Sequence, residues 1–138
     1  MTRFTPYISF PGNAEEMLTF YHSVFGGDLQ IQKYDDMDTS GFPFTPPAGA
    51  VAHATLRSDA FSVCGGDDCQ PEPEPFDRGN LSFLLEPETT DEAERLIDAL
   101  TADGGTITMP FAQAPWGDFY GQAEDKFGMA WQFSVSPK

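Results

Sequence analysis

The sequence is poor in cysteine and in long apolar segments, and each shortage excludes a class of protein. Its two cysteines, Cys64 and Cys69, are too few for a disulfide framework or for a zinc site built from cysteine alone. No run of about eighteen apolar residues is present to cross a membrane, and the first ten residues lack the pattern of a secretion signal. We therefore expect a cytoplasmic protein with reduced thiols.

Basic residues are also scarce. The 138 residues include 7 Lys and Arg against 22 Asp and Glu, which gives a formal net charge of −15. Because this charge repels nucleic-acid phosphates and anionic lipids, neither nucleic acid nor a membrane surface is an expected partner. The hydrophobic fraction of 40%, with 13 Phe, suffices for the core of a single domain over residues 1–138.

The order of signals in the first half of the chain is repeated in the second. In each half a strand precedes an amphipathic helix, which ends at paired glycines and is followed by three strands. Asn13 and Thr89 are the expected helix N-caps, each in a capping box with the Glu three residues later. Two loops rich in proline and glycine, 35–49 and 65–79, are expected to act as lids or dimer arms. The predicted strands are 4–10, 29–34, 51–57, 61–64, 80–85, 106–109, 119–124 and 129–135.

This repeat predicts an α+β fold of two βαβββ modules, about 1–68 and 79–138, with the helices on the outer face of curled mixed sheets. Alternation along the strands predicts which side chains face the helices: Ile8, Phe10, Ala52, Ala54, Leu56, Leu81, Phe83, Leu85, Trp131, Phe133 and Val135. The opposite face is polar, so it is either the solvated side of a flat sheet or the lining of a cup-shaped pocket. The pocket interpretation predicts a small-molecule ligand bound by Tyr7, Ser9, His53, Arg57, Asn80, Trp116, Tyr120 and Gln132.

Two of the residues on the polar face are candidates for proton transfer. Because imidazole groups in general exchange protons near neutral pH, His53 is a candidate general base, although a structural histidine fits its position equally well. Glu124 is the weaker candidate, because it leads into 125–128, which has the composition of a hairpin turn. Arg57 fits either a clamp for an anionic ligand group or a surface ion pair.

Several short segments together resemble a known family over nearly the whole chain. They are Pro6-Tyr7-Ile8-Ser9-Phe10, Gly12-Asn13-Ala14-Glu15-Glu16, Phe20-Tyr21, Phe25-Gly26-Gly27, Ala52-His53-Ala54, Trp116-Gly117-Asp118, Gly121, Asp125-Lys126-Phe127-Gly128 and Trp131. In this order they resemble the PhnB-like branch of the vicinal oxygen chelate superfamily. That superfamily includes glyoxalase I, extradiol dioxygenases, fosfomycin-modifying enzymes and bleomycin-binding proteins. The resemblance implies paired βαβββ modules, a cup-shaped site and a homodimer.

In the metal enzymes of this superfamily, His and Glu side chains hold a divalent ion. The resemblance places the four ligand positions at Thr5 or Pro6, His53, Asn80 and Gln132, and His53 is the one conventional ligand among them. We therefore expect no tight metal site and no cofactor. The expected function is small-molecule binding or a lyase or isomerase type of reaction, with the substrate unknown and the question of enzymatic activity open.

Two alternatives remain at this stage, a metal-dependent enzyme of the glyoxalase or dioxygenase kind and a sequestering protein of the bleomycin-resistance kind. Some members of the branch carry the label of a demethylubiquinone methyltransferase. Methyl transfer is disfavoured, because no strand is followed by a G-x-G turn and helix that would hold a nucleoside cofactor.

Overall fold

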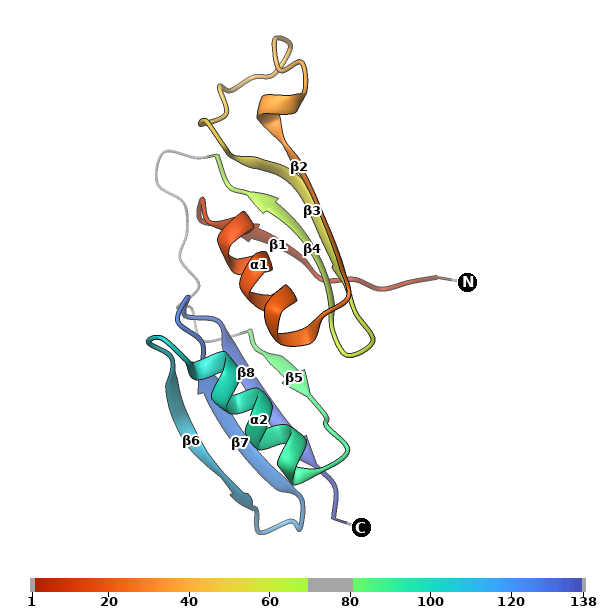
Figure 1. The fold of residues 1–138 in the computed structure, drawn as a ribbon, viewed down its shortest axis with the longest axis vertical. Coiled ribbons are helices and arrows are strands. Elements are labelled where there is room, and N and C mark those ends of the chain that lie inside the picture. The colour runs from red at the N-terminus through yellow and green to blue at the C-terminus, as the bar shows by residue number, and fades with distance from the viewer. Residues whose placement is uncertain (1, 70–80, 138) are drawn as a thin grey trace. The chain divides into compact units, whose positions relative to one another are not determined.

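The computed structural model describes residues 2–69 and 81–137, and these residues form two four-stranded mixed sheets, each covered on one face by a helix (Figure 1). The chain divides into two compact units, Met1–Pro75 and Phe76–Lys138, and each contains one βαβββ module, as predicted. Among the described residues, no helix has the length and apolar character needed to span a bilayer. The elements are β1 Tyr7–Phe10, α1 Ala14–Phe25, β2 Asp28–Lys33, a short 3₁₀ helix Tyr34–Asp36, β3 Val51–Arg57, β4 Ser62–Asp67, β5 Phe83–Leu85, α2 Thr90–Thr101, β6 Thr106–Gln113, β7 Phe119–Glu124 and β8 Ala130–Val135.

The two sheets have the same topology. The strand order is β1-β4-β3-β2 in the first unit and β5-β8-β7-β6 in the second, with the first strand of each module parallel to the fourth and the other pairs antiparallel. Each helix packs its apolar stripe on its own sheet. The fully buried core side chains include Phe10, Met17, Leu18, Tyr21, Val51, Leu56, Val63, Leu100, Trp131 and Phe133. The face of each sheet opposite its helix is left free for polar residues.

The two helices begin where predicted but are capped differently. In the second unit the Thr89 hydroxyl accepts a hydrogen bond from the Glu92 backbone N–H at 3.1 Å, which confirms the predicted cap. In the first unit Asn13 is the cap residue but its side chain makes no capping bond. Instead the carboxylate of Asp67, at the end of β4, accepts from the N–H of Ala14 at 2.8 Å. The prediction of a capping box at Asn13 is therefore wrong, because a carboxylate distant in sequence takes its place at the positive end of the helix.

Three predicted strand boundaries are also wrong. Phe4 is 90% exposed and lies outside β1, whose pairing with β4 begins at Tyr7. Leu81 is 82% exposed, so it faces solvent and not the helix, and β5 begins two residues later. At the end of β4, Gly65 belongs to the strand and not to the following loop. A side chain at Gly65 would lie 2.4 Å from the Ile8 carbonyl oxygen, so the close approach of β1 requires glycine there.

The edge strand β6 is longer than predicted and irregular. It continues through Pro110 to Gln113, and its register with β7 shifts twice, between Ile107 and Met109 and between Met109 and Ala112. An edge strand tolerates proline because one side of its backbone needs no ladder hydrogen bond. In the same sheet, Gly121 of β7 leaves space for Phe111, whose Cα would lie 2.9 Å from an added Cβ.

Candidate functional site

The polar face of the first sheet brings His53 into a connected group of side chains. The Thr55 hydroxyl lies 3.4 Å from His53 Nε2 and 3.7 Å from the sulfur of Cys64, its partner in the neighbouring strand β4. Tyr7 stacks on the imidazole with ring centroids 6.1 Å apart and is itself 60% exposed. Gly66 keeps the space beside the Tyr7 hydroxyl clear, because an added Cβ would lie 3.2 Å from that oxygen. A titratable group, a hydroxyl, a thiol and an exposed ring therefore share one surface.

The polar face of the second sheet carries a tighter network. The Tyr120 hydroxyl donates to Gln132 Oε1 at 2.5 Å and accepts from Gln122 Nε2 at 2.8 Å. Gln132 in turn donates through Nε2 to the Ser82 hydroxyl at 2.6 Å. Trp116, 66% exposed, lies with its ring edge toward Tyr120 at 5.8 Å between centroids. These bonds fix the orientation of both amides and of the phenol.

The two groups follow one pattern on counterpart strands. The third strand of each module supplies two residues spaced i and i+2, and the fourth strand supplies the residue directly paired with the second of them. We call these groups the polar triads: His53, Thr55 and Cys64 in the first unit, and Tyr120, Gln122 and Gln132 in the second. Each has an exposed aromatic ring beside it, Tyr7 and Trp116 respectively. Exposed rings next to ordered polar groups are typical of ligand-binding surfaces.

The structure places the other predicted site residues less centrally. Ser9 lies on β1 opposite Gly66 and is exposed. Arg57 lies at the far end of β3, paired in register with Asp28, and within residues 2–69 and 81–137 it forms no ion pair. Glu124 shares the face of Tyr120 but is exposed at the end of β7. Asn80 lies outside the described residues. The convergence of residues from both sheets on one cup-shaped pocket stays a prediction.

Thr55, Cys64, Ser82 and Gln122 belong to these groups, although the sequence did not single them out as binding residues. The i, i+2 spacing of His53 with Thr55, and of Tyr120 with Gln122, was the available signal. Cys64 carried no such signal, because only the strand register places it opposite Thr55.

Among the described side chains at the ligand positions of the metal enzymes, His53 is the one conventional ligand for a divalent ion. The first position is Thr5, whose neutral hydroxyl is a weak ligand, or Pro6, whose side chain has no donor atom, and the Oε1 and Nε2 atoms of Gln132 are both engaged in the network of the second triad. His53 lies on β3 whereas Gln132 lies on β8, and these strands are not counterparts in the repeat. The part of the chain that the structure describes contains no group of three His, Cys, Asp or Glu side chains arranged to hold a metal.

Cys69 lies just beyond β4 in acidic surroundings. Burial raises the pKa of its thiol, and the charges of Asp67 and Asp68 raise it further. The Tyr34 hydroxyl, which hydrogen-bonds Cys69, has a raised pKa as well, again mainly through burial. A raised pKa disfavours the thiolate, which is the reactive form of the Cys69 side chain.

Comparison with known proteins decides the family. The profile of the family described as 3-demethylubiquinone-9 3-methyltransferase matches residues 2–134. The chain belongs to this family. A solved relative, PA1353 from Pseudomonas aeruginosa, is 30% identical, with a TM-score of 0.80 and full coverage of both chains. A PhnB protein from Bacillus cereus is 26% identical over 98% of this chain and 100% of its own, with a TM-score of 0.75.

The fold of this family is that of the vicinal oxygen chelate superfamily. A glyoxylase/bleomycin resistance protein/dioxygenase domain from Frankia covers 100% of this chain and 94% of its own with a TM-score of 0.64, at 13% identity. The resemblance to the PhnB-like branch is thereby confirmed, as is the predicted pair of βαβββ modules. Fold membership leaves the chemistry to be argued from the side chains.

Proposed function

We propose that each polar triad forms a binding surface for a small organic ligand, which the protein binds or transforms without a tightly held metal ion. The observation that carries this proposal is the repetition of the triad on counterpart strands of both modules, each with an exposed ring beside it, Tyr7 on β1 and Trp116 in the turn between β6 and β7. On a sheet face that is only solvated, water would satisfy the polar side chains, and no hydrogen-bond network would be required. Here such a network fixes the orientation of the side chains of Tyr120, Gln122, Gln132 and Ser82.

The chemistry of the triads favours a flat polar ligand. Tyr7 and Trp116 present exposed ring surface for stacking, while hydroxyl and amide groups offer donors and acceptors at the edge of the ligand. The net charge of −15 disfavours a highly anionic ligand unless Arg57 meets its charge. We therefore expect a neutral or weakly charged conjugated molecule.

His53 is the group in the first triad that can accept a proton. Its Nε2 contacts the Thr55 hydroxyl, and its ring is held flat against Tyr7. In a lyase or isomerase reaction His53 would remove a proton from a molecule bound at the first triad. The Tyr120 network would orient the oxygens of a molecule bound at the second triad. Glu124 remains the weaker candidate for such a role.

Methyl transfer, which the family description names, is not the proposal. The turns that lead from β1 to α1 and from β5 to α2 contain one glycine, Gly12, and none, respectively. Neither turn has the repeated glycines that let a backbone approach the nucleoside and phosphate groups of a cofactor.

The experiment is a fragment screen by heteronuclear NMR on the full chain, repeated with His53→Gln and Tyr120→Phe. We expect hits to shift the amides of β3, β4, β7 and β8, and we expect each variant to weaken binding by about tenfold, the value of one well-placed hydrogen bond. Ser23→Ala on the helix face of the first unit is the control and should bind as the wild type does. Hits that bind both triad variants as tightly as they bind the wild type would overturn the proposal. A screen with Zn²⁺, Mn²⁺ or Ni²⁺ that gave stoichiometric binding lost in His53→Gln would favour the metal-dependent alternative.

We also propose that the protein works as a homodimer, as the family resemblance implies. Supporting this, the loop after β2 exposes apolar side chains at Met37, Phe42 and Phe44, with Phe42 and Phe44 packed edge-on against Tyr34. Light scattering should give twice the 15.2 kDa of one chain. Phe42→Ser with Phe44→Ser should shift the mass toward that of a monomer, and a monomeric wild type would contradict the proposal.

A further inference from the structure

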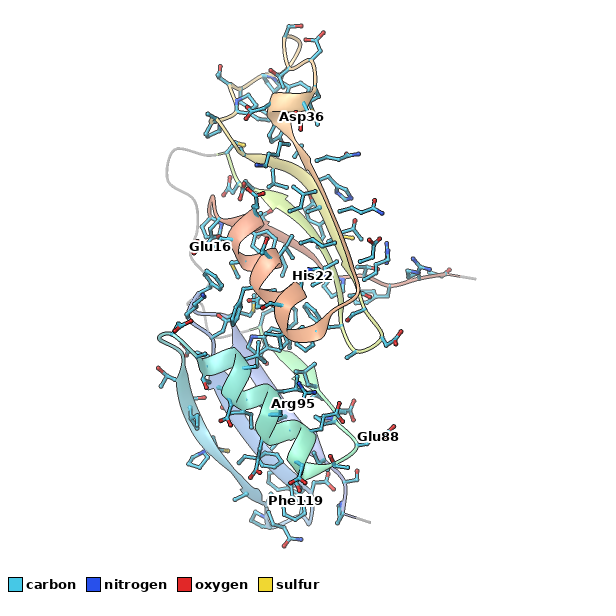
Figure 2. All side chains as sticks on the ribbon, in the orientation of Figure 1. Glu16, His22, Asp36, Glu88, Arg95 and Phe119 are labelled. Atoms are coloured by element: carbon cyan, nitrogen blue, oxygen red, sulfur yellow. The ribbon has the colours of Figure 1, made fainter. Side chains whose placement is uncertain are left out.

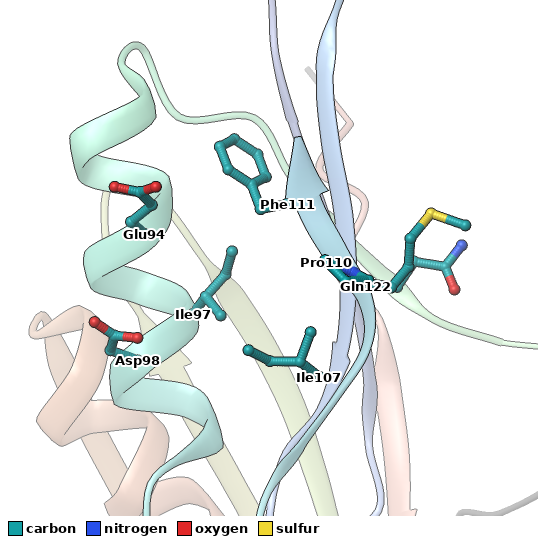
Figure 3. A pocket seen from close by; sticks show the side chains of 8 residues that line it. Glu94, Ile97, Asp98, Ile107, Pro110, Phe111 and Gln122 are labelled. Carbon is teal, nitrogen blue, oxygen red and sulfur yellow. The ribbon is translucent and has the colours of Figure 1, made fainter. Parts of the chain in front are cut away.

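The second unit contains a groove of about 300 Å³ between helix α2 and the edge strand β6 (Figure 3). Its lining residues are Glu94, Ile97, Asp98, Ile107, Met109, Pro110, Phe111 and Gln122. Figure 3 shows Ile97, Ile107 and Phe111 between the helix and the strand, and both carboxylates on the helix beside them. The groove therefore has an apolar floor and an acidic wall. Most of its lining lies on the helix side of the sheet, and Gln122, a member of the polar triad of this unit, lines it as well.

The acidic wall is not neutralised within the described part of the chain. Glu94 and Asp98 are four residues apart on α2, so they lie one above the other on the same side of the helix. Both are exposed, and among residues 2–69 and 81–137 neither has a basic group within 4 Å. Arg95 (labelled in Figure 2) lies three residues before Asp98 and so neighbours it on the helix surface, but within residues 2–69 and 81–137 it forms no ion pair with either carboxylate. The two carboxylates together attract a cation to a surface that otherwise suits an apolar group.

The strand side of the groove favours a small ligand over a protein strand. Although β6 is an edge strand, Pro110 lacks an N–H, and two register shifts interrupt the regular ladder. Proline and bulges are devices by which edge strands avoid pairing with another chain. The volume of about 300 Å³ lies at the lower end of the range for small-ligand pockets. Ile107 is 52% exposed, so apolar surface remains for a ligand to cover.

We propose that this groove is a second binding site, which takes a small amphipathic cation of the arylalkylammonium class. The ring of the ligand lies on Ile97, Ile107 and Phe111, and its ammonium group lies between the carboxylates of Glu94 and Asp98. The site does not depend on the function proposed for the polar triads, because the apolar residues and the two carboxylates assigned to the ligand are not triad residues; Gln122 lines the groove but has no assigned role there.

The test uses 2-phenylethylammonium as the cationic probe and 2-phenylethanol as the neutral probe of similar shape. Both are titrated at millimolar concentrations into the full chain with isotope-labelled Ile and Met methyl groups. We expect the cation to shift the methyl resonances of Ile97 and Ile107 and to bind about tenfold more tightly than the alcohol, since two surface ion pairs together are worth about that factor. Added salt should reduce this difference.

Paired variants locate the charge effect. Glu94→Gln with Asp98→Asn should reduce the affinity for the cation to that for the alcohol. Asp36→Asn with Glu88→Gln removes the same charge at exposed positions that do not line the groove (labelled in Figure 2) and should leave most of the preference intact. Equal loss in both double variants would show a non-specific field effect and overturn the site. So would shifts confined to residues around Tyr120, or no shifts at all.

Discussion

The hairpin between β7 and β8 depends on a buried carboxylate, and its replacement is a sharp test of the second module. Asp125 is 3% exposed. Its Oδ1 accepts hydrogen bonds from the backbone N–H groups of Phe127 at 2.9 Å and Met129 at 3.0 Å. Its Oδ2 accepts from the indole Nε1–H of the fully buried Trp131 at 3.0 Å. Asp125→Asn keeps the shape of the side chain but turns one oxygen into a donor.

The magnitude follows from these contacts. The asparagine carbonyl can still accept from the backbone of the turn, but its NH₂ group then faces the indole N–H, and neither donor has an acceptor. Losing a hydrogen bond to a charged group costs about 1.5–3 kcal/mol, and a buried donor left without a partner costs about 1–3 kcal/mol. We expect Asp125→Asn to lower the free energy of unfolding by about 3 kcal/mol. That is a large share of the roughly 5–15 kcal/mol that stabilises a typical domain.

The assay is urea denaturation followed by far-UV circular dichroism, with Trp131→Phe as the second arm of a double-mutant cycle. Because phenylalanine has no N–H, Asp125→Asn should cost less by about 1–3 kcal/mol in that background. Glu88→Gln, exposed in the same unit, is the control and should change stability by less than about 0.5 kcal/mol. An Asp125→Asn variant as stable as the control, or a cycle with no coupling, would refute the account of this turn.

Three further outcomes are expected from single positions. Gly121→Ala should destabilise the second unit by about 1–3 kcal/mol in urea denaturation, because the new methyl group would press on the backbone of Phe111. An unchanged midpoint of denaturation would show that the backbone of β6 moves aside without cost. Asp67→Ala should cost about 1–2 kcal/mol and increase hydrogen exchange in the first turn of α1, and unchanged exchange there would mean that the cap is dispensable. Native Cys69 should react with iodoacetamide more slowly than it does in the urea-unfolded chain at about pH 8, because its raised pKa keeps it protonated. The same shift should make stability fall as pH rises from the unfolded pKa of this thiol through its folded pKa, and equal rates with a flat profile would contradict both.

The elements of the fold were predictable because most of their signals are local. The amphipathic period and the paired glycines located both helices, and strands β3 and β7 have the predicted bounds. The errors involve residues whose meaning depends on distant contacts. From the sequence alone, Gly65 has the character of a loop residue. The structure shows that β1 approaches it so closely that a side chain does not fit there. Pro110 ended the predicted strand, although it lies in an edge strand that tolerates it. Asp67 caps a helix that begins 53 positions earlier.

The polar face was predictable, but the partners on it were not. Alternation placed His53, Tyr120 and Gln132 on the side away from the helices, as their contacts with other polar residues there show. Which side chains meet across the strands depends on register, which alternation leaves open. The bond from Tyr120 to Gln132 thus required the pairing of β7 with β8, and the contact of Thr55 with Cys64 required that of β3 with β4.

The two triads share positions but differ in how much bonding capacity they retain. The Tyr120 hydroxyl both donates and accepts within its own network, over short distances, so the protein itself fixes its geometry before any ligand arrives. The contacts of Thr55 with His53 and Cys64 are long, at 3.4 and 3.7 Å, and exchange readily for stronger ones. A ligand of the first triad therefore gains by bonding to loosely held side chains, whereas a ligand of the second triad packs on a surface whose geometry is already fixed. On this reasoning the second triad selects its ligand by shape and orientation, while the first, with its imidazole, selects by chemistry.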